Sequence, residues 1–287
     1  METLTFEGKL TALTPIFTGG DLKTGVEQGI RKTPYIVNGE RIDVPYVSGS
    51  SIRGNVRRLL LQDMFEQIGY TVKSLKVFYQ YSGGALENSD NESDSGTMDL
   101  KLRREVRALI LPISLLGCSK GNQAFSGKVF AGLAVPICSE LNDFLPIQSK
   151  ISFHKYLSHT VFQTRRAERE IPVSVELPVE QIQLNQNRKE KKEPTIQMKV
   201  NYETLSPGAM LYHKWILKDT TQLEKSCFAR AIELWKQRPY VGGKANCGFG
   251  EVKIDYPTLQ YTSEDYLAFL SERKTEIGGC LDKLGQL

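Results

Sequence analysis

The clearest indication of the fold is the segment AMLYHKWILKDTTQLEKSCFARAIELWKQRPYVGGKANCGFGEVKIDY (209–256). Its residues indicate a strand over 209–217, a helix from Thr221 to about Gln237, and a second strand over 250–256. Thr221 and Glu224 have the spacing of a capping box, which marks the start of the helix. The predicted buried face of this helix consists of Leu223, Cys227, Ala231 and Trp235.

A strand and a helix are also predicted near the N-terminus. Apolar and polar residues alternate over 3–12, which is typical of a half-buried strand, and apolar residues recur at helical spacing over 50–68, with Ser50 or Ser51 as the N-cap. Between them, Pro15 and the pair Gly19-Gly20 indicate a loop that runs to about Val47. Together with the strand, helix and strand of 209–256, these elements predict an α+β fold, a modified ferredoxin-like (RRM-like) core with large insertions.

Two segments are predicted to be insertions into this core. Residues 82–99 carry five acids and no base, with almost no apolar side chains, which predicts a mobile acidic insertion. Residues 173–184 and 196–202 alternate like strands around the basic stretch NQNRKEKKEPT (185–195), which predicts a projecting β-hairpin with a charged tip. The chain is therefore predicted to be one domain, 1–287, with its core at about 1–80, 100–160 and 203–262, the acidic insertion at 82–99, the hairpin at about 163–202, and an acidic helix that begins at Thr262 and runs to about 284.

The net charge of +4 hides an uneven distribution. Besides the acidic insertion, residues 251–287 carry seven acids against four bases. Basic residues form four clusters, at Arg53, Arg57 and Arg58; at Lys101, Arg103, Arg104 and Arg107; at Arg165, Arg166 and Arg169; and at Arg188, Lys189, Lys191 and Lys192. A single cluster is usually a solvated face, but four of them beside segregated acids indicate a polyanionic partner.

The positions of the cysteines and histidines argue for reduced thiols and against a metal site. Five scattered cysteines without a CxxC pair, in a chain with no apolar signal core at its start, predict reduced thiols and a cytoplasmic location. The three histidines, at 154, 159 and 213, have no metal-ligand spacing. The sequence therefore predicts no metal site and no cofactor.

The predicted start of the helix over 50–68 is a candidate phosphate site. Gly49, Ser50 and Ser51 stand there with Arg53 and Arg57, which share a helix face because they are four residues apart. Free backbone N–H groups, the positive end of the helix dipole and nearby guanidinium groups favour an anion. The alternative, equally weighted on this segment alone, is a capped surface helix with solvated arginines.

The loop GGKANCGFG (242–250) is a second candidate site. It fits neither a Walker A loop nor a Rossmann fingerprint. Its glycines, beginning with Gly242 and Gly243, would let the backbone approach a ligand closely. Lys244 and Asn246 would then contact a phosphate or sugar group of that ligand. The alternative is a flexible connector.

Three segments in order, LTALTPIFTGG (10–20), VPYVSGSSIRGNVRRLL (44–60) and YVGGKANCGFGEVKI (240–254), resemble the RAMP superfamily of CRISPR-associated proteins. Members have a TPI/GG turn after the first strand, a GSS helix start and a terminal glycine-rich loop. Ser48 stands where proline is commoner, and Asn246-Cys247 where Asn-Arg or similar is usual. The segment 163–202 is similar in position to the thumb of the backbone subunits, and MKVNYETLSPGAMLYHKWIL (198–217) resembles those of types IV and I-D more than type III.

This resemblance implies a non-catalytic subunit that polymerises along CRISPR RNA (crRNA) and presents it for pairing with target DNA or RNA. The implied partners are further copies of the chain in a helical filament and other CRISPR effector subunits, with a helicase or nuclease among the candidates. The implied RNA-binding residues are Ser50, Ser51, Arg53, Arg57, Arg58, Arg165, Arg166, Arg169, Gly242, Gly243, Lys244 and Asn246. The implied thumb residues are Ile182, Leu184, Arg188, Lys189, Lys191, Lys192, Ile196 and Met198.

The sequence also raises catalytic alternatives. Type III backbone subunits cut target RNA with an aspartate expected here around 29–33, where the sequence has no acid; Asp21 and Asp43 lie at the ends of the predicted loop. A guide-processing RAMP ribonuclease usually uses a histidine in the first half, whereas His154 and His159 flank the thumb. A single RRM-type module is a further alternative, but the aromatic triplet of RNP1 is not visible. The sequence therefore predicts no ribonuclease activity.

Overall fold

The main sheet has the strand order of a ferredoxin-like fold. The computed structural model describes residues 2–24, 27–72, 78, 81–82, 100–120, 123–164, 198–257 and 259–286. In it, β1 (Thr3–Ala12), β8 (Val129–Ala131), β12 (Met210–Lys218) and β13 (Val252–Asp255) are ordered β13-β1-β12-β8, and β9 (Val135–Pro136) also pairs with β12. All of these pairings are antiparallel. Helix α1 (Gly49–Ile68) lies between β1 and β8 in the chain, and α6 (Gln222–Gln237) between β12 and β13. This split β-α-β arrangement confirms the predicted α+β, ferredoxin-like core.

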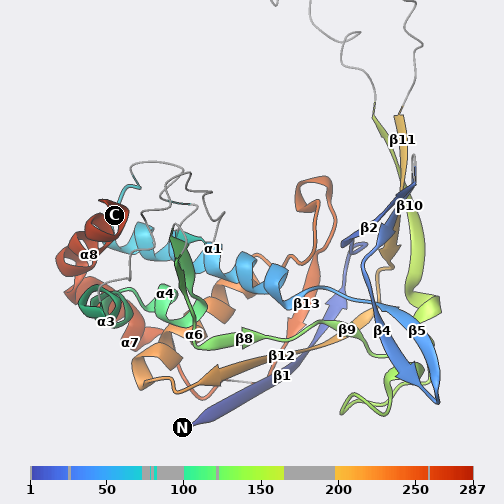
Figure 1. Cartoon of the computed structure of the whole chain (residues 1–287), viewed down its shortest axis with the longest axis horizontal. Helices are drawn as coiled ribbons and strands as arrows, with labels where there is room; N and C mark the ends of the chain where they lie inside the picture. The colour runs from blue at the N-terminus through green and yellow to red at the C-terminus, as the bar shows by residue number, and fades with distance from the viewer. Residues whose placement is uncertain are drawn as a thin grey trace, which may run out of the picture.

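The helices gather on one face of this sheet, which places the main core between the two layers (Figure 1). Helices α1 and α6 are joined there by α3 (Leu100–Leu109), α4 (Leu111–Leu116), α7 (Glu264–Glu272) and α8 (Lys274–Gln286). Strand β1 alternates as predicted, with Leu10 and Ala12 buried in the core and Thr3 and Thr5 exposed. The largest buried side chains, Trp215 of β12 and Trp235 of α6, pack edge to face with ring centroids 6.0 Å apart.

Helix α6 begins with the predicted capping box. The Oγ1 atom of Thr221 accepts a hydrogen bond from the Glu224 N–H, and the Glu224 carboxylate accepts one from the Thr221 N–H at 2.8 Å. The same carboxylate, only 2% exposed, accepts hydrogen bonds from Ser114 of α4 and from Lys128 before β8, both at 2.7 Å. Burial raises the pKa of Glu224, but the hydrogen bonds from Lys128, Thr221 and Ser114 outweigh it and hold the pKa below its ordinary value. One capping residue thus also ties α6 to α4 and β8.

We expect Glu224→Gln to lower the free energy of unfolding by about 2 kcal/mol at neutral pH, because it removes a buried, charge-assisted set of hydrogen bonds. A carboxyl group with a lowered folded-state pKa stabilises the fold above its unfolded-state pKa, and this contribution is lost as the pH falls through the folded-state pKa. The difference between wild type and variant, measured by urea unfolding, should therefore shrink on acidification. Glu272→Gln, at an exposed position near the end of α7, is the matched control. A difference that stays constant with pH would contradict this account.

A second sheet occupies the segment that the sequence assigned to a loop. Strands β2 (Gly19–Thr24), β3 (Glu27–Ile30), β10 (Leu157–Thr164) and β11 (Met198–Leu205) are ordered β10-β11-β3-β2, and β4 (Lys32–Val37) pairs with β5 (Glu40–Pro45). The prediction of a loop to about Val47 is therefore wrong. Strand β3 pairs antiparallel with its neighbour β2 and in parallel with β11, a partner far away in the sequence. The β4–β5 hairpin turns at Asn38-Gly39, both with positive φ (51° and 83°), which is a turn signal present in the sequence.

Strands β10 and β11 form a stem that projects from the body of the molecule (Figure 1). They pair antiparallel out to Thr164 and Met198, so the partner of β11 is 157–164, and the prediction that 196–202 pairs with 173–184 is wrong in its partner. Glu203 anchors the stem, because its carboxylate accepts hydrogen bonds from the Ile30 N–H at 3.1 Å and from Lys32 Nζ at 2.7 Å. The predicted strand over 173–184, the charged tip and the acidic insertion from residue 83 onward lie outside the described residues.

Two helix boundaries differ from the prediction. The N-cap of α1 is Ser48, whose side chain accepts a hydrogen bond from the Ser51 N–H, and neither Ser50 nor Ser51 is the cap. The acidic C-terminal helix is two helices, α7 and α8, because the backbone leaves helical geometry at Arg273 (φ −108°, ψ 18°). The remaining strands, β6 (Cys118–Lys120) and β7 (Gln123–Phe125), form a short hairpin.

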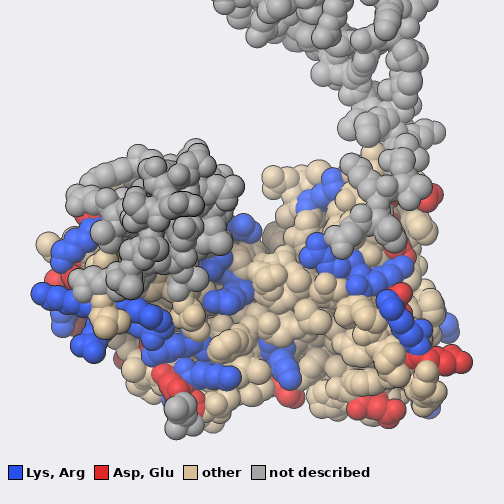
Figure 2. All heavy atoms as spheres, viewed as in Figure 1, with Lys and Arg blue, Asp and Glu red and all other residues tan. Residues whose placement is uncertain are grey.

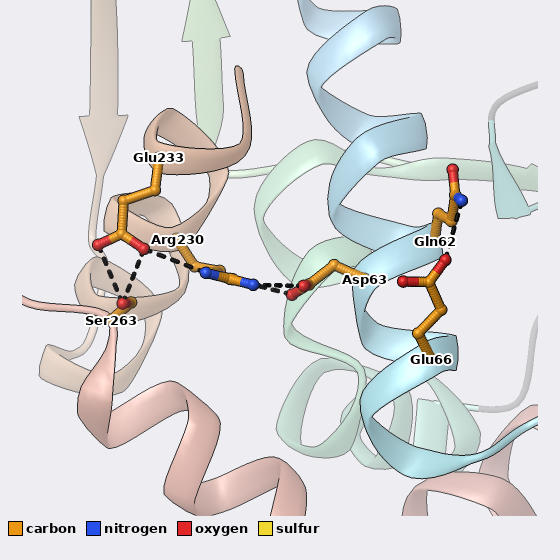
Figure 3. A network of polar contacts seen from close by, with 6 residues as sticks. All are labelled: Gln62, Asp63, Glu66, Arg230, Glu233 and Ser263. Atoms are coloured by element: carbon orange, nitrogen blue, oxygen red, sulfur yellow. Dashed lines mark hydrogen bonds and ion pairs between the residues drawn. The ribbon is translucent and has the colours of Figure 1, made fainter. Parts of the chain in front are cut away.

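A polar network fixes α1 against the last third of the chain (Figure 3). Asp63 of α1 accepts two hydrogen bonds from Arg230 of α6, the shorter at 2.6 Å. Arg230 also contacts Glu233 at 3.4 Å, and Ser263, just before α7, donates to the Glu233 carboxylate at 2.9 Å. Helices α1, α6 and α7 are therefore held in one arrangement.

Candidate nucleic-acid interface

The start of α1 lies directly against the backbone of β8. A Cβ atom added at Gly49 would lie 2.2 Å from the Ala131 carbonyl oxygen and 2.4 Å from that of Gly132, distances that no side chain tolerates. Gly49 therefore lets the helix begin in contact with the sheet edge. Ser50 and Ser51 follow on the exposed first turn, where the Oγ atom of Ser50 donates to that of Ser48 at 3.2 Å.

The three arginines of α1 have different environments. Arg58 is exposed. Arg53 donates to the Leu116 carbonyl at 2.6 Å, and Arg57 donates to the carbonyls of Leu116 and Gly117 at 3.2 Å each. Burial lowers the pKa of Arg53, and burial together with the nearby charge of Arg53 lowers the pKa of Arg57. Arg53 and Arg57 thus satisfy the last carbonyls of α4, and Arg58 is the arginine of this cluster most accessible to an anion.

The glycine loop is anchored to the chain segment that follows β1. The Gly243 N–H donates to the Phe17 carbonyl at 2.8 Å, and the Gly250 N–H donates to the Pro15 carbonyl at 2.9 Å. Gly250 has φ 78°, and a Cβ atom there would lie 2.0 Å from the Val241 carbonyl oxygen. This position therefore requires glycine for both backbone conformation and space. These contacts hold the loop in a defined shape, unlike a flexible connector.

The two candidate sites meet in one cavity of about 430 Å³. Asn55 of α1 joins them, because its Nδ2 donates to the Tyr240 carbonyl at 3.0 Å. The lining residues are Ser51, Asn55, Arg58, Tyr240, Val241, Gly242, Lys244, Ala245, Asn246 and Cys247. The sequence prediction named Ser51, Arg58, Gly242, Lys244 and Asn246, and it missed Asn55 and Tyr240. Positions 51, 55 and 58 follow helical spacing, which was the available signal for Asn55.

Lys244 links this cavity to the base of the stem. Its backbone is left-handed (φ 61°), and its Nζ lies over the ring of Tyr202 on β11, 4.6 Å from the ring centroid. Tyr202 packs with Phe17 and Phe249 in a small aromatic cluster. A cation on the glycine loop is thus held beside the stem by cation–π attraction, which makes the cavity and the stem one continuous surface.

Basic side chains continue beyond the cavity. Figure 2 shows Lys and Arg side chains spread over the lobe that contains α3 and along the hollow beside the second sheet. On α3, Arg107 donates to the Ser126 carbonyl at 3.1 Å, while Lys101 and Arg104 are exposed. Met198 begins β11. The other predicted RNA-binding and thumb residues lie outside the described residues: Arg165, Arg166, Arg169, Ile182, Leu184, Arg188, Lys189, Lys191, Lys192 and Ile196.

The groups considered for catalysis do not converge in the described part of the chain. Asp43 lies on β5 and forms an ion pair with Arg41 at 3.3 Å. His154 and His159 are both exposed, on a short turn and on β10. His213 is fully buried, where desolvation lowers its pKa to about 3. Among the described residues, no group of three or more His, Cys, Asp or Glu side chains could hold a metal ion, and no helix could cross a membrane.

Comparisons with known proteins place the chain in a family. The model of the RAMP superfamily matches residues 9–253. No curated protein sequence matches the chain. A chain of the solved structure titled "Type IV-B CRISPR Complex" has the same fold, with a TM-score of 0.60 and 18% sequence identity over 90% of this chain and 92% of that chain. Because the family match runs from the first strand of the main sheet into its last, the protein belongs to the RAMP superfamily.

Proposed function

We propose that this protein is a guide-RNA-binding backbone subunit of a CRISPR ribonucleoprotein complex, of type IV or a I-D-like type. The observation that carries the proposal is the single cavity in which the start of α1 meets the glycine loop. Membership of the RAMP superfamily and the fold shared with a chain of a type IV-B CRISPR complex support it.

The chemistry of the cavity suits a phosphate backbone. Arg58 and Lys244 supply charge, the Ser51 hydroxyl supplies a donor, and the helix N-terminus adds a positive dipole. Contacts of this kind position a strand and carry no sequence information. A subunit that must accept every guide sequence requires this property.

The stem suits a role in spacing the bases. It carries Val161, which is 57% exposed, and it starts beside Lys244, so a strand that leaves the cavity would meet it next. Apolar thumb residues at or beyond the end of the stem, with Ile182, Leu184, Ile196 and Met198 as candidates, would then wedge between bases. Such stacking contacts are worth about 1–3 kcal/mol each and tolerate any base.

The proposed subunit does not cut RNA. The segment 29–33, where a type III-like catalytic aspartate is expected, contains no acid, and Asp43 is paired with Arg41. The proposed partners are crRNA, target DNA or RNA, further copies of the chain in a filament, and other effector subunits, with a helicase or nuclease among the candidates. The proposed location is the cytoplasm.

The test is a series of guide RNAs of increasing length. Size-exclusion chromatography with mass measurement should give complexes whose protein content rises in steps with guide length, and the RNA recovered from them should be intact. A single copy on every length would support a lone RNA-binding module and contradict the proposal. A single cut in the repeat would indicate guide processing, and periodic cuts in an added target RNA would indicate a type III-like backbone.

A further inference from the structure

We propose that the cavity between α1 and the glycine loop also holds one nucleobase, stacked on the ring of Tyr240. This inference rests on the proposed function, because it assumes that a single RNA strand passes through the cavity. It adds a base-binding subsite to what is otherwise a set of phosphate contacts.

Tyr240 is fixed through its backbone and free in its side chain. Its carbonyl accepts hydrogen bonds from Asn55 Nδ2 at 3.0 Å and from Trp235 Nε1 at 3.4 Å, and its N–H donates to the Arg238 carbonyl at 2.9 Å. The residue is nevertheless 36% exposed and lines the cavity. Among the described residues, its phenol group makes no hydrogen bond or ring contact. The part of the Tyr240 ring that faces the cavity is thus exposed, and within the described part of the chain it has no hydrogen bond or ring contact that would hinder stacking.

The rest of the cavity has the chemistry of a nucleotide site. Its volume of about 430 Å³ falls within the range of about 300–1,000 Å³ that is usual for small-molecule sites. Lys244 and Arg58 line the same cavity and can take the phosphate that accompanies the base. An unstacked base of single-stranded RNA seeks an aromatic face, and Tyr240 is the aromatic residue that lines this cavity.

The polar edge of the subsite accommodates any base. Asn246 is exposed and lines the cavity, and its amide offers both a donor and an acceptor. Each of the four bases has at least one complementary group on its edge. A stacked base held in this way contributes affinity without selecting a guide sequence, so the subsite is compatible with a sequence-independent backbone protein.

The test compares short single-stranded RNA with an abasic oligomer of the same length and the same number of phosphates. The dissociation constant of the abasic oligomer divided by that of the RNA reports base contacts, because phosphate contacts are common to both probes. We expect Tyr240→Leu to reduce this ratio by at least about fivefold, while Tyr240→Phe retains it, since stacking needs the ring and not the hydroxyl. Phe130→Leu, at an aromatic residue 45% exposed on β8 and outside the cavity, is the control and should leave the ratio unchanged.

The outcomes separate this subsite from the proposed function. If wild type binds both probes and Tyr240→Leu keeps the wild-type ratio, the subsite is absent while RNA binding stands. If wild type binds neither probe, the proposed function and the subsite both fail. A 5-iodouridine-substituted RNA adds a positional readout, because photo-crosslinking should attach it to Tyr240 in the wild type, and a crosslink confined to other residues would overturn the assignment.

Discussion

Replacement of Gly49 by alanine is expected to destabilise the protein by about 3 kcal/mol. The added methyl group would lie 2.2 Å and 2.4 Å from two carbonyl oxygens of the β8 segment, and neither belongs to a flexible side chain. Either the start of α1 or β8 must therefore move, and overpacking of this kind costs about 1–3 kcal/mol or more. Urea unfolding of the purified variant measures the loss.

Gly54 provides a matched control in the same helix. A Cβ atom there would have no neighbour within 4 Å, so Gly54→Ala gains helix propensity without a clash. We expect it to stabilise the protein by about 0.5–1 kcal/mol. The same substitution, five residues apart, should thus have opposite signs. Equal effects at the two positions would show that helix propensity, and not the contact with β8, determines the role of Gly49.

Reversal of charge at the cavity is expected to have the largest effect on RNA binding. The double variant Arg58→Glu with Lys244→Glu replaces the two proposed phosphate contacts by two repulsive charges. Because a hydrogen bond to a charged group is worth about 1.5–3 kcal/mol, the dissociation constant should rise by at least about a hundredfold. Fluorescence anisotropy with labelled guides of unrelated sequence measures it, and the loss should be the same for every guide.

The control for this variant reverses two exposed lysines outside the cavity, Lys218→Glu on β12 and Lys274→Glu at the start of α8. It changes the net charge equally and should weaken binding much less. Similar losses in both double variants would indicate a general charge effect and contradict a specific site. Arg53 and Arg57 are poorer targets, because their guanidinium groups also hold the carbonyls of Leu116 and Gly117.

The sequence predicts the core of this fold well because its signals there are local. The capping box of Thr221 and Glu224, the alternation over 3–12 and the helical spacing over 50–68 all depend on neighbouring residues, and each element forms where it is expected. The second sheet is different. Strand β3 has four residues and lies between β2, its neighbour in the sequence, and the distant β11, and no local pattern reveals this second partner. The β4–β5 hairpin was predictable, since Asn38-Gly39 is a turn signal.

The candidate site was predictable in its parts and not in its assembly. The helix start and the glycine loop could each be named from residue types, because glycine, serine and basic residues have known roles at anion sites. Their meeting across 185 residues depends on the order of the main sheet, which brings Tyr240 to Asn55. The internal bonds of Arg53 and Arg57 depend in turn on where α4 ends, and the sequence alone did not place that point.

The proposed function requires this cavity to hold RNA through its phosphates. The most direct test is the slope of log Kd against log salt concentration for wild type and for the neutral double variant Arg58→Gln with Lys244→Gln. Two phosphate contacts to single-stranded RNA account for a slope of about 1.4, so the variant's slope should be smaller by that amount with every guide sequence. A slope equal to that of wild type, or a loss that depends on the guide sequence, would contradict the claim.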